Sequence, residues 1–384
     1  MLQLWDQQDN DSPVEAPSRI LVPGPVRVTV HITCFGRRAE GTFVAVTPVE
    51  ALERIAELLM RGRAPSYRVQ AFRRAAREIS TVPDEELQRL AEAGRLTDIP
   101  GVGEKSAAVI VEALRGDTPA YLVKLMGEIP EPGTDAGEAL RALLKGDLHS
   151  HSDWSDGGDT IAAMAGKARD LGHEYFALTD HSPRLKIANG LSADRLCEQL
   201  EIVAALNDEL APFRILTGGE CDILDDGALD QSEELLARVD VVVASVHSKL
   251  RMEPDAMTRR MVAAVASPHV DVLGHCTGRL LAGRGRPEST FDEDVVIEAC
   301  RQFDTALEVN CRPERLDPPK RILTKAVEAG LRIAISTDAH ATEQLEWQPY
   351  GTDRAAACGV TAARVVNAMP AGELLEWCSS HPTL

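Results

Sequence analysis

Hydrophobic and polar positions divide the chain into two parts with different periodicities. From Thr47 to about residue 125, apolar residues recur at helical spacing, beginning with Leu52, Ile55 and Leu59. Thr47 fits an N-cap, a proline follows at the first helical position, and a glutamate three residues after Thr47 completes a capping box. The sequence therefore predicts a small all-helical domain over residues 47–125.

From residue 146 onward, short β-rich runs alternate with helical stretches. The predicted strands are residues 146–149, 174–180, 214–224, 239–247, 270–276, 305–310 and 331–340, and the helices between them include 160–171, 192–209, 254–266, 291–302 and 318–329. This alternation is typical of a parallel sheet with crossover helices. Seven strands favour an α/β barrel of βα units over an open sheet.

Two segments lie outside these elements. Residues 1–46 begin with a polar, acidic stretch that we expect to be disordered, and continue with two strand-like runs around a turn; nothing in them indicates a role. Residues 126–145 contain GEIPEPGTDAG, which has the composition of a linker. The predicted order is an unassigned segment (1–46), a helical domain (47–125), a linker (126–145) and a barrel (146–384).

Composition and charge narrow the class of protein. The chain has 384 residues and a formal charge of −19, so overall charge does not favour nucleic acid, although a local basic patch is compatible with these values. No apolar run approaches the ~20 residues of a membrane helix, and the acidic start lacks the regions of a signal peptide. The eight cysteines form no C-x-x-C pair, which indicates reduced thiols. We expect a cytoplasmic protein.

Histidines and carboxylates gather at the ends of the predicted strands. Six of the ten histidines stand there: His149, His151, His181, His247, His275 and His340. Carboxylates accompany them: Asp147, Asp180, Glu220 and Asp338. The carboxyl ends of barrel strands share one face, and alternate residues point the same way, so H-x-H and D-x-H each direct two side chains to one centre.

A single histidine at a strand end is usually a hydrogen-bonded polar residue, but a set this large would leave many buried groups unpaired without a metal. Nitrogen and oxygen ligands suit zinc, manganese or iron, and the absence of cysteine argues against a closed structural zinc site. The remaining histidines, His31, His173, His269 and His381, follow no strand end and are expected to be structural or solvated.

The motifs GDLHSHSDWSDG, ALTDHS, GGECDI, SVHSK, VLGHCTGRLL and ISTDAH resemble, in order, those of the PHP (polymerase and histidinol phosphatase) family. The resemblance covers about 240 residues and implies a distorted (β/α)7 barrel with two or three divalent ions, Mn²⁺ or Zn²⁺, with iron as a further option. It implies a first metal on His149, His151, Glu220 and Asp338, a second on Glu220, His247 and His275, and a third on Asp156, His181 and His340.

Three acidic residues in the first motif have different expected roles. Some family members have histidine where Asp156 stands, which alters the expected metal preference. Asp147 matches the motif, but we expect it to orient a ligand histidine rather than touch a metal. Asp153 is expected to be solvated.

Such a centre predicts phosphoester hydrolysis, because paired divalent ions activate water and stabilise the oxygens of a phosphoryl group. The residues expected at the reacting centre are His149, His151, Glu220 and Asp338. Basic residues near the ligands are candidates for holding the phosphate, with ordinary surface charge as the alternative: Lys249, Arg251, Arg279, Arg312 and Arg315.

Residues 96–114, LTDIPGVGEKSAAVIVEAL, form a helix-hairpin-helix pattern. Gly101 and Gly103 let backbone N–H groups approach a phosphate, and Lys105 is placed to contact it. Six arginines, including Arg68, Arg73 and Arg74, precede the hairpin with no acid between residues 61 and 77. A basic run is usually a solvated face, but beside such a hairpin it favours sequence-independent DNA binding.

Residues 48–125 resemble the small N-terminal domain of family X DNA polymerases, and bacterial members of that family also end in a PHP domain. Only some 20 residues separate the two blocks here, too few for a polymerase domain. Val109 stands where lyase-active relatives have a Schiff-base lysine, so no lyase activity is predicted.

Three functions fit these patterns. The favoured one is a metal-dependent phosphoesterase of DNA repair, a 3′–5′ exonuclease or a DNA-end phosphatase, directed to DNA by the helical domain. The second is a small-molecule phosphomonoesterase such as a histidinol phosphatase. The third is a non-catalytic DNA-binding scaffold, against which the intact ligand set argues. The oligomeric state is open.

Overall fold

The computed structural model describes residues 46–129, 131–282 and 285–382. The expectations for residues 1–45, including His31, lie outside that range. Five helices form the N-terminal domain: α1 (Pro48–Arg61), α2 (Ser66–Ser80), α3 (Asp84–Glu92), α4 (Glu104–Leu114) and α5 (Ala120–Glu128), with the short 3-10 turn η1 (Leu96–Asp98) before the hairpin. The predicted capping box is present, since Thr47 N donates to Glu50 Oε2 at 2.8 Å and Glu50 N donates to Thr47 Oγ1 at 3.3 Å.

Seven parallel strands follow in the order β1 to β7, which confirms the predicted barrel. They are β1 (Gly146–Asp147), β2 (Tyr175–Leu178), β3 (Arg214–Asp222), β4 (Val241–Ser245), β5 (Val272–Leu273), β6 (Ala306–Asn310) and β7 (Ile333–Ser336). Beyond the short β1, His151 N donates to Ala339 O at 2.7 Å and Asp338 N donates to His149 O at 2.9 Å. These bonds join the first strand to the last.

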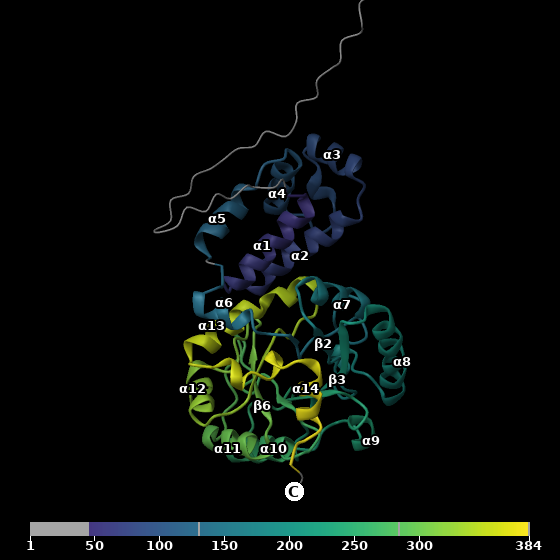
Figure 1. Ribbon diagram of the computed structural model, residues 1–384. Helices are drawn as coiled ribbons and strands as arrows, with labels where there is room; N and C mark the ends of the chain where they lie inside the picture. Colours follow the sequence, from purple (N-terminus) through teal and green to yellow (C-terminus); the bar gives the residue numbers. More distant parts are fainter. Residues whose placement is uncertain (1–45, 130, 283–284, 383–384) are drawn as a thin grey trace, which may run out of the picture.

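Helices surround the strands in chain order (Figure 1). They are α7 (Ile161–Asp170), α8 (Ala193–Leu210), α9 (Glu233–Leu236), α10 (Pro254–Val265), α11 (Glu293–Phe303), α12 (Lys320–Glu328) and α13 (Gln348–Ala357). Most residues of β2, β4 and β7 are apolar and all are buried, as expected of a sheet covered by helices. No helix within the described ranges is both long and apolar enough to span a membrane.

A last helix, α14 (Ala371–Cys378), covers the amino end of the barrel. Leu374 and Trp377 pack there with barrel residues such as Leu148 and Tyr175. After α14, His381 Nε2 lies 2.8 Å from Asp271 Oδ1, and this contact ties the end of the chain's described part to the barrel. The opposite end, where the polar strand ends meet, is therefore the open one.

The segment predicted as a linker contains a helix. Residues Asp135–Arg141 form α6, which packs against α13. Asp353 of α13 accepts hydrogen bonds from Gly133 N (2.8 Å), Thr134 N (2.7 Å) and Thr134 Oγ1 (2.8 Å). A Cβ at Gly137 would collide with Asp353, so this close contact requires glycine. The connection is docked on the barrel because its apolar and capping residues find partners there.

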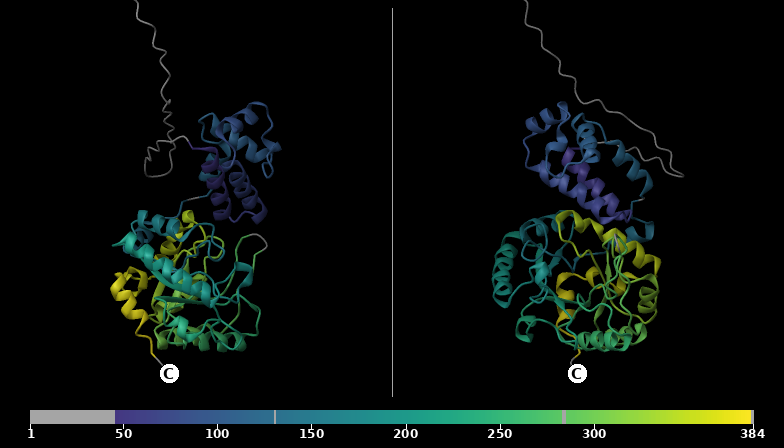
Figure 2. Two further views of the ribbon diagram at one scale, coloured as in Figure 1. Left: turned by 90° about the vertical axis from the view of Figure 1, so that its right-hand side faces the viewer. Right: turned by 180° about the vertical axis from the view of Figure 1, so that it is seen from behind.

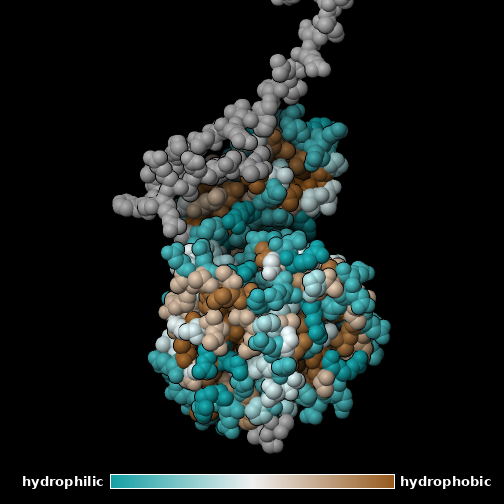
Figure 3. Space-filling view, in the orientation of Figure 1, coloured by the Kyte–Doolittle hydropathy of each residue, from teal (hydrophilic) through white to brown (hydrophobic). Residues whose placement is uncertain are grey.

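The helical domain overhangs the open face of the barrel. In the left view of Figure 2 it is displaced toward the side opposite the yellow α14. Arg61 of α1 lies 2.8 Å from Glu131 and stacks over the Tyr350 ring at 5.5 Å. Hydrophilic residues line the band where the two domains meet (Figure 3). A molecule at the open face thus lies beside both domains.

Candidate metal centre and nucleic-acid surface

Glu220 is the centre of the side-chain cluster at the open face. It is 1% exposed and lies near the carboxyl end of β3. Its Oε1 lies 2.8 Å from His275 Nε2 and 3.2 Å from His247 Nε2. β4 pairs with β3 and β5 pairs with β4, and the segments that follow β4 and β5 bring these two histidines to the same oxygen.

The second oxygen of Glu220 faces the other side of the barrel. Its Oε2 lies 2.9 Å from His181 Nδ1, 3.4 Å from His149 Nε2 and 3.6 Å from His151 Nε2. One carboxylate therefore stands between five histidines, with a different group of rings at each oxygen. This is the arrangement expected of a carboxylate that bridges two metal ions.

Asp338 joins the cluster from the end of β7. Its Oδ1 lies 3.5 Å from His151 Nε2 and 3.9 Å from His149 Nε2. At φ +54° its backbone adopts the left-handed region, which is uncommon for a residue other than glycine and turns the chain toward His340.

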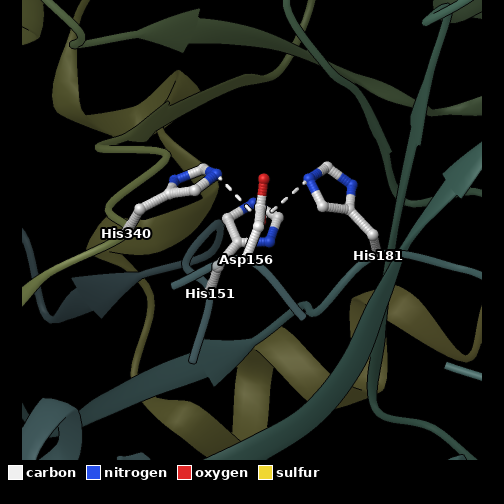
Figure 4. A group of neighbouring side chains, drawn as sticks. All are labelled: His151, Asp156, His181 and His340. Atoms are coloured by element: carbon white, nitrogen blue, oxygen red, sulfur yellow. Dashed lines mark ion pairs between the residues drawn. The ribbon is translucent and has the colours of Figure 1, made fainter. Parts of the chain in front are cut away.

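A further group lies nearer to solvent, where Asp156 sits between two rings. Asp156 Oδ1 lies 3.4 Å from His181 Nε2 and 3.3 Å from His340 Nε2. Figure 4 shows these two rings pointing at Asp156 from opposite sides, with His151 behind. Asp156 comes from the loop after β1 and is 38% exposed at its side chain.

Among the residues that the structure describes, potential ligand atoms fall into three overlapping groups within which all pairs lie inside 4.8 Å. These groups are His151, Asp156, His181 and His340; His149, His151 and Asp338; and His181, Glu220 and His247. His151 and His181 each belong to two groups. All nine predicted ligands lie in one cluster, and their division among individual ions stays a prediction.

Buried polar atoms in the cluster lack partners, which fits a metal site. Within the described residues, both oxygens of Glu220, Nε2 of His149 and both ring nitrogens of His151 and His247 have no hydrogen bond of acceptable geometry. Leaving so many buried groups unpaired costs free energy that a bound cation would recover. The donor set of imidazoles and carboxylates is the set that zinc, manganese and iron accept.

The pKa values of the buried groups in the cluster shift in different directions. Against the effect of burial, Glu220, Glu308 and Asp338 raise the pKa of His149 well above its usual value. Burial, with His340 and His181 nearby, instead lowers the pKa of His151 well below its usual value. The neighbouring histidines overcome burial to lower the pKa of Glu220, so its carboxylate is held ionised.

The sequence reasoning missed Glu308 and Asn310, both on β6. Glu308 Oε1 lies 2.6 Å from His149 Nδ1, and its Oε2 accepts from His275 N at 2.6 Å. Asn310 Nδ2 donates to Glu308 Oε2 at 3.1 Å and to Asp338 Oδ2 at 3.0 Å. The available signal was a glutamate inside the apolar run TALEVN, because a buried charge needs a partner.

Asp147 acts on the backbone rather than on an imidazole ring. Its carboxylate accepts from His149 N at 3.1 Å and from Thr337 N at 3.1 Å. Burial raises the pKa of Asp147 to about 6. Asp147 therefore holds the backbone of His149, while Glu308 contacts the ring of that residue, and the expectation that Asp147 orients a ligand histidine stays a prediction. Asp153 is exposed, as expected.

Two of the predicted phosphate-binding arginines border the cluster. Arg312 Nη1 lies 3.4 Å from Asp338 Oδ1, and its Nη2 lies 2.9 Å from Glu314. Arg315 Nε lies 3.3 Å from Asp338 Oδ2, and its buried Nη1 has no hydrogen-bond partner among the described residues. Both guanidinium groups stand beside a metal-ligand candidate.

Arg279 does not fit the predicted role. Its guanidinium donates to the carbonyl oxygens of Arg315 and Leu316 and lies 3.2 Å from Glu288, so it fixes the loop that carries Arg315. Lys249 is exposed and pairs with Asp225, and Arg251 is exposed.

The hairpin of the helical domain is built as its glycines predict. Gly101 has φ +93°, and a Cβ there would lie 2.8 Å from the Arg74 side chain. Gly103 precedes α4 and its N–H donates to Ser106 Oγ at 2.9 Å. Lys105 is exposed at the start of α4.

A pocket of about 470 Å³ opens at this hairpin. It is lined by Tyr67, Arg68, Ala71, Phe72, Gly101, Gly103, Lys105 and Ser106. Arg68 donates to Tyr121 Oη at 2.6 Å, and the Arg74 side chain is 58% exposed. Arg73 differs from these, because its Nη2 lies 3.5 Å from Met60 Sδ. Burial lowers the pKa of Arg73, and its charge also interacts with those of Glu314 and Arg312 of the barrel. Arg73 thus faces the barrel and not the hairpin pocket.

Two family models match the chain. A helix-hairpin-helix domain covers residues 47–119, and a PHP domain covers residues 147–310. The matches agree with the helical domain and with the barrel that carries the histidine cluster.

Related proteins have nuclease and phosphatase names. DNA polymerase/3'-5' exonuclease PolX of Bacillus subtilis (strain 168) is 42% identical to this chain over 247 residues. The matched residues are 64% of this chain and 43% of the relative, so the chain spans less than half of that protein. A protein named as a probable phosphatase from Caldanaerobacter subterraneus is 29% identical over 215 residues, 52% of this chain and 77% of the relative.

Among solved structures, histidinol phosphate phosphatase from Lactococcus lactis, complexed with zinc, L-histidinol and phosphate, has a TM-score of 0.42 and 18% identity. The match covers 56% of this chain and 94% of that one. This likeness is weak and adds nothing to the topology described above.

Proposed function

We propose that this chain, which joins a helix-hairpin-helix domain to a PHP domain, is a metal-dependent phosphoesterase that acts on DNA ends. The observation that carries the proposal is the Glu220 carboxylate, buried with a different group of histidine nitrogens at each oxygen. The cluster is a candidate for two or three divalent ions, and zinc and manganese suit its ligands.

We assign the ligands as the family resemblance implies. His149, His151, Glu220 and Asp338 would hold one ion, Glu220 with His247 and His275 a second, and Asp156, His181 and His340 a third. Ions bound there would lower the pKa of a coordinated water and neutralise the oxygens of a phosphoryl group. Glu308 keeps the His149 ring oriented, with its Nδ1 side occupied and Nε2 directed to the centre.

The substrate phosphate would bind beside Asp338. Arg315 offers a buried Nη1 that has no hydrogen-bond partner among the described residues, and Arg312 stands on the other side of Asp338. A guanidinium group binds a phosphate through two parallel N–H···O hydrogen bonds, and its rigid plane keeps the loss of conformational entropy per bond small. These two arginines are the proposed contacts to the scissile phosphate.

DNA is the favoured substrate because of the helical domain. The pocket at the hairpin combines backbone N–H groups, Lys105 and Arg68, which is the chemistry that binds a nucleic-acid phosphate. The segment that connects the two domains is docked on the barrel through Asp353, and Arg61 of the helical domain stacks over Tyr350 of α13, so a strand held at the hairpin would stay near the open face. An exonuclease and an end phosphatase are both compatible with this arrangement.

A small-molecule phosphomonoesterase is the second candidate, favoured by the phosphatase name of a relative that this chain covers to 77%. A substrate screen separates the two. The purified chain, loaded with Mn²⁺ or Zn²⁺, is offered single-stranded and duplex DNA, a 3′-phosphorylated oligonucleotide and histidinol phosphate. Release of nucleotides or phosphate from DNA supports the proposal, and turnover of histidinol phosphate alone contradicts it.

A further inference from the structure

One loop at the open face begins and ends at a predicted metal ligand. Residues 182–190 leave the end of β2 after His181 and return to it, since Leu191 N donates to His181 O at 2.7 Å. Within the loop, Ala188 N and Gly190 N both donate to Leu185 O, at 3.0 and 3.2 Å. The loop is therefore a compact excursion rather than an open strand.

Side-chain contacts fix the shape of this loop. Asn189 has φ +55°, and its Nδ2 donates to Trp154 O at 3.0 Å. Arg195 of α8 donates to Asn189 O at 2.8 Å and stacks over the Trp154 ring at 5.8 Å. The tip of the loop is thus tied to the segment that carries Asp156.

The tip exposes an apolar side chain between two cations. Ile187, in the short 3-10 turn η2 (Lys186–Ala188), is 95% exposed. Arg184 and Lys186 are also exposed, and neither forms an ion pair within the described part of the chain. No acid occurs between residues 183 and 190, although the whole chain carries a formal charge of −19. A single exposed isoleucine is ordinary on a surface, but here a rigid loop presents it next to the metal cluster.

The position of the tip suits a nucleic-acid strand. Leu191 hydrogen-bonds to the backbone of His181. Ile187 precedes Leu191 by four residues, so the Cα atoms of Ile187 and Leu191 lie within about 14 Å of each other. That distance is on the order of two or three nucleotides. Arg184 lies on the same rim of the barrel as the ion pair of Lys249 with Asp225, and its backbone N–H donates to Asp230 at 2.9 Å, so basic and acidic side chains alternate there.

We propose that residues 182–190 form a strand-binding element, in which Ile187 packs against the face of an unpaired base and Arg184 and Lys186 pair with neighbouring phosphates. This inference rests on the proposed function and specifies its substrate: DNA ends whose terminal bases are unpaired. Base faces are available to an apolar side chain in a single strand and are covered by stacking in a duplex.

The test compares Ile187→Ser with Ile202→Ser in the full chain. Ile202 is also exposed, at 41%, but it lies on α8, the outer helix that follows this loop, and serves as the matched control. The measured quantity is the ratio of the KM for a single-stranded oligonucleotide to the KM for p-nitrophenyl phosphate. We expect Ile187→Ser to raise this ratio by about 5- to 20-fold, the lower part of the range for stacking contacts. Ile202→Ser should leave it unchanged.

A second variant tests the charges. Replacing Arg184 and Lys186 together by glutamine should make the slope of log KM against log salt shallower by about 1.4, since each phosphate contact contributes about 0.7 for single strands. Equal ratios for Ile187→Ser and Ile202→Ser, with DNA still cleaved, overturn the strand-binding element and leave the proposed function standing. A wild-type chain that hydrolyses p-nitrophenyl phosphate but no oligonucleotide overturns both.

Discussion

His149 Nδ1 lies 2.6 Å from Oε1 of Glu308, although the two residues are 159 positions apart, the first just after β1 and the second on β6. The other oxygen of Glu308 accepts from His275 N and from Asn310 Nδ2. Glu308 thus fixes two of the candidate metal ligands without being one of the predicted ligands itself.

Replacing Glu308 by glutamine should weaken metal binding by about 10- to 100-fold, as is usual for partners of ligand histidines. At the Oε2 position the amide nitrogen would meet two donors, the His275 N–H and the Asn310 side chain, and at the Oε1 position it would face His149 Nδ1, which must carry a proton when Nε2 binds a metal. Competition with a chelator measures the effect, and Asp153→Asn, an exposed carboxylate in the same loop region as Asp156, is the matched control. Equal affinities in the two variants would show that Glu308 does not orient a ligand.

Asp353 should hold the connection between the two domains on the barrel, because it accepts three hydrogen bonds from residues 133 and 134. Asp353→Ala is expected to make the connection between the domains sensitive to proteolysis and to reduce activity on DNA ends more than activity on p-nitrophenyl phosphate. Asp135→Ala, an exposed aspartate on α6, should change neither. Unchanged proteolysis of Asp353→Ala would show that the docking does not depend on this residue.

Lys105 should contribute one phosphate contact at the hairpin. Lys105→Ala is expected to weaken duplex binding at every sequence tested and to reduce the slope of log affinity against log salt by about 0.9. Arg115→Ala, at the other end of α4, removes an exposed cation away from the pocket and is the control. Binding that is independent of salt, or equally weakened by Arg115→Ala, would contradict a DNA site at the hairpin.

His173, which is not one of the candidate metal ligands, should make stability depend on pH. Burial and then Arg141, 3.4 Å away, lower the pKa of His173 to about 4. The unfolded chain takes up this proton near pH 6.5 and the folded chain only near 4, so stability is complete above pH 6.5 and falls as the pH drops between these values.

His173→Gln should therefore lose less stability than the wild type on acidification, by up to about 3 kcal/mol. Urea midpoints at several pH values, measured with a chelator to exclude metal effects, give the comparison. His269→Gln, a half-buried histidine far from Arg141, is the control. Parallel loss in wild type and His173→Gln would refute the linkage.

The sequence predicted those features that follow from short patterns. The alternation of strands and helices gave the barrel, and the histidines at strand ends gave the cluster, because parallel strands bring their carboxyl ends to one face. Thr47 and Glu50 likewise predicted the first turn of α1. In each case the information lies within a few neighbouring residues.

Features that depend on distant contacts were missed or misplaced. Glu308 gains its role only because β6 pairs with β5 and the barrel brings its side chain to His149, which follows β1. Residues 135–141 read as a linker because a seven-residue helix has little periodicity, and its stability comes from Asp353. Arg73 and Arg279 carry the expected charge, but tertiary structure directs the first to the barrel and uses the second to hold a loop.

The central claim, a metal centre bridged by Glu220, is tested most directly by elemental analysis of Glu220→Gln beside the wild-type chain. We predict two or three equivalents of divalent metal in the wild type. In the variant we predict a loss of at least one equivalent together with nearly all hydrolysis of p-nitrophenyl phosphate, while circular dichroism shows the fold retained. Full metal content in folded Glu220→Gln would contradict the account.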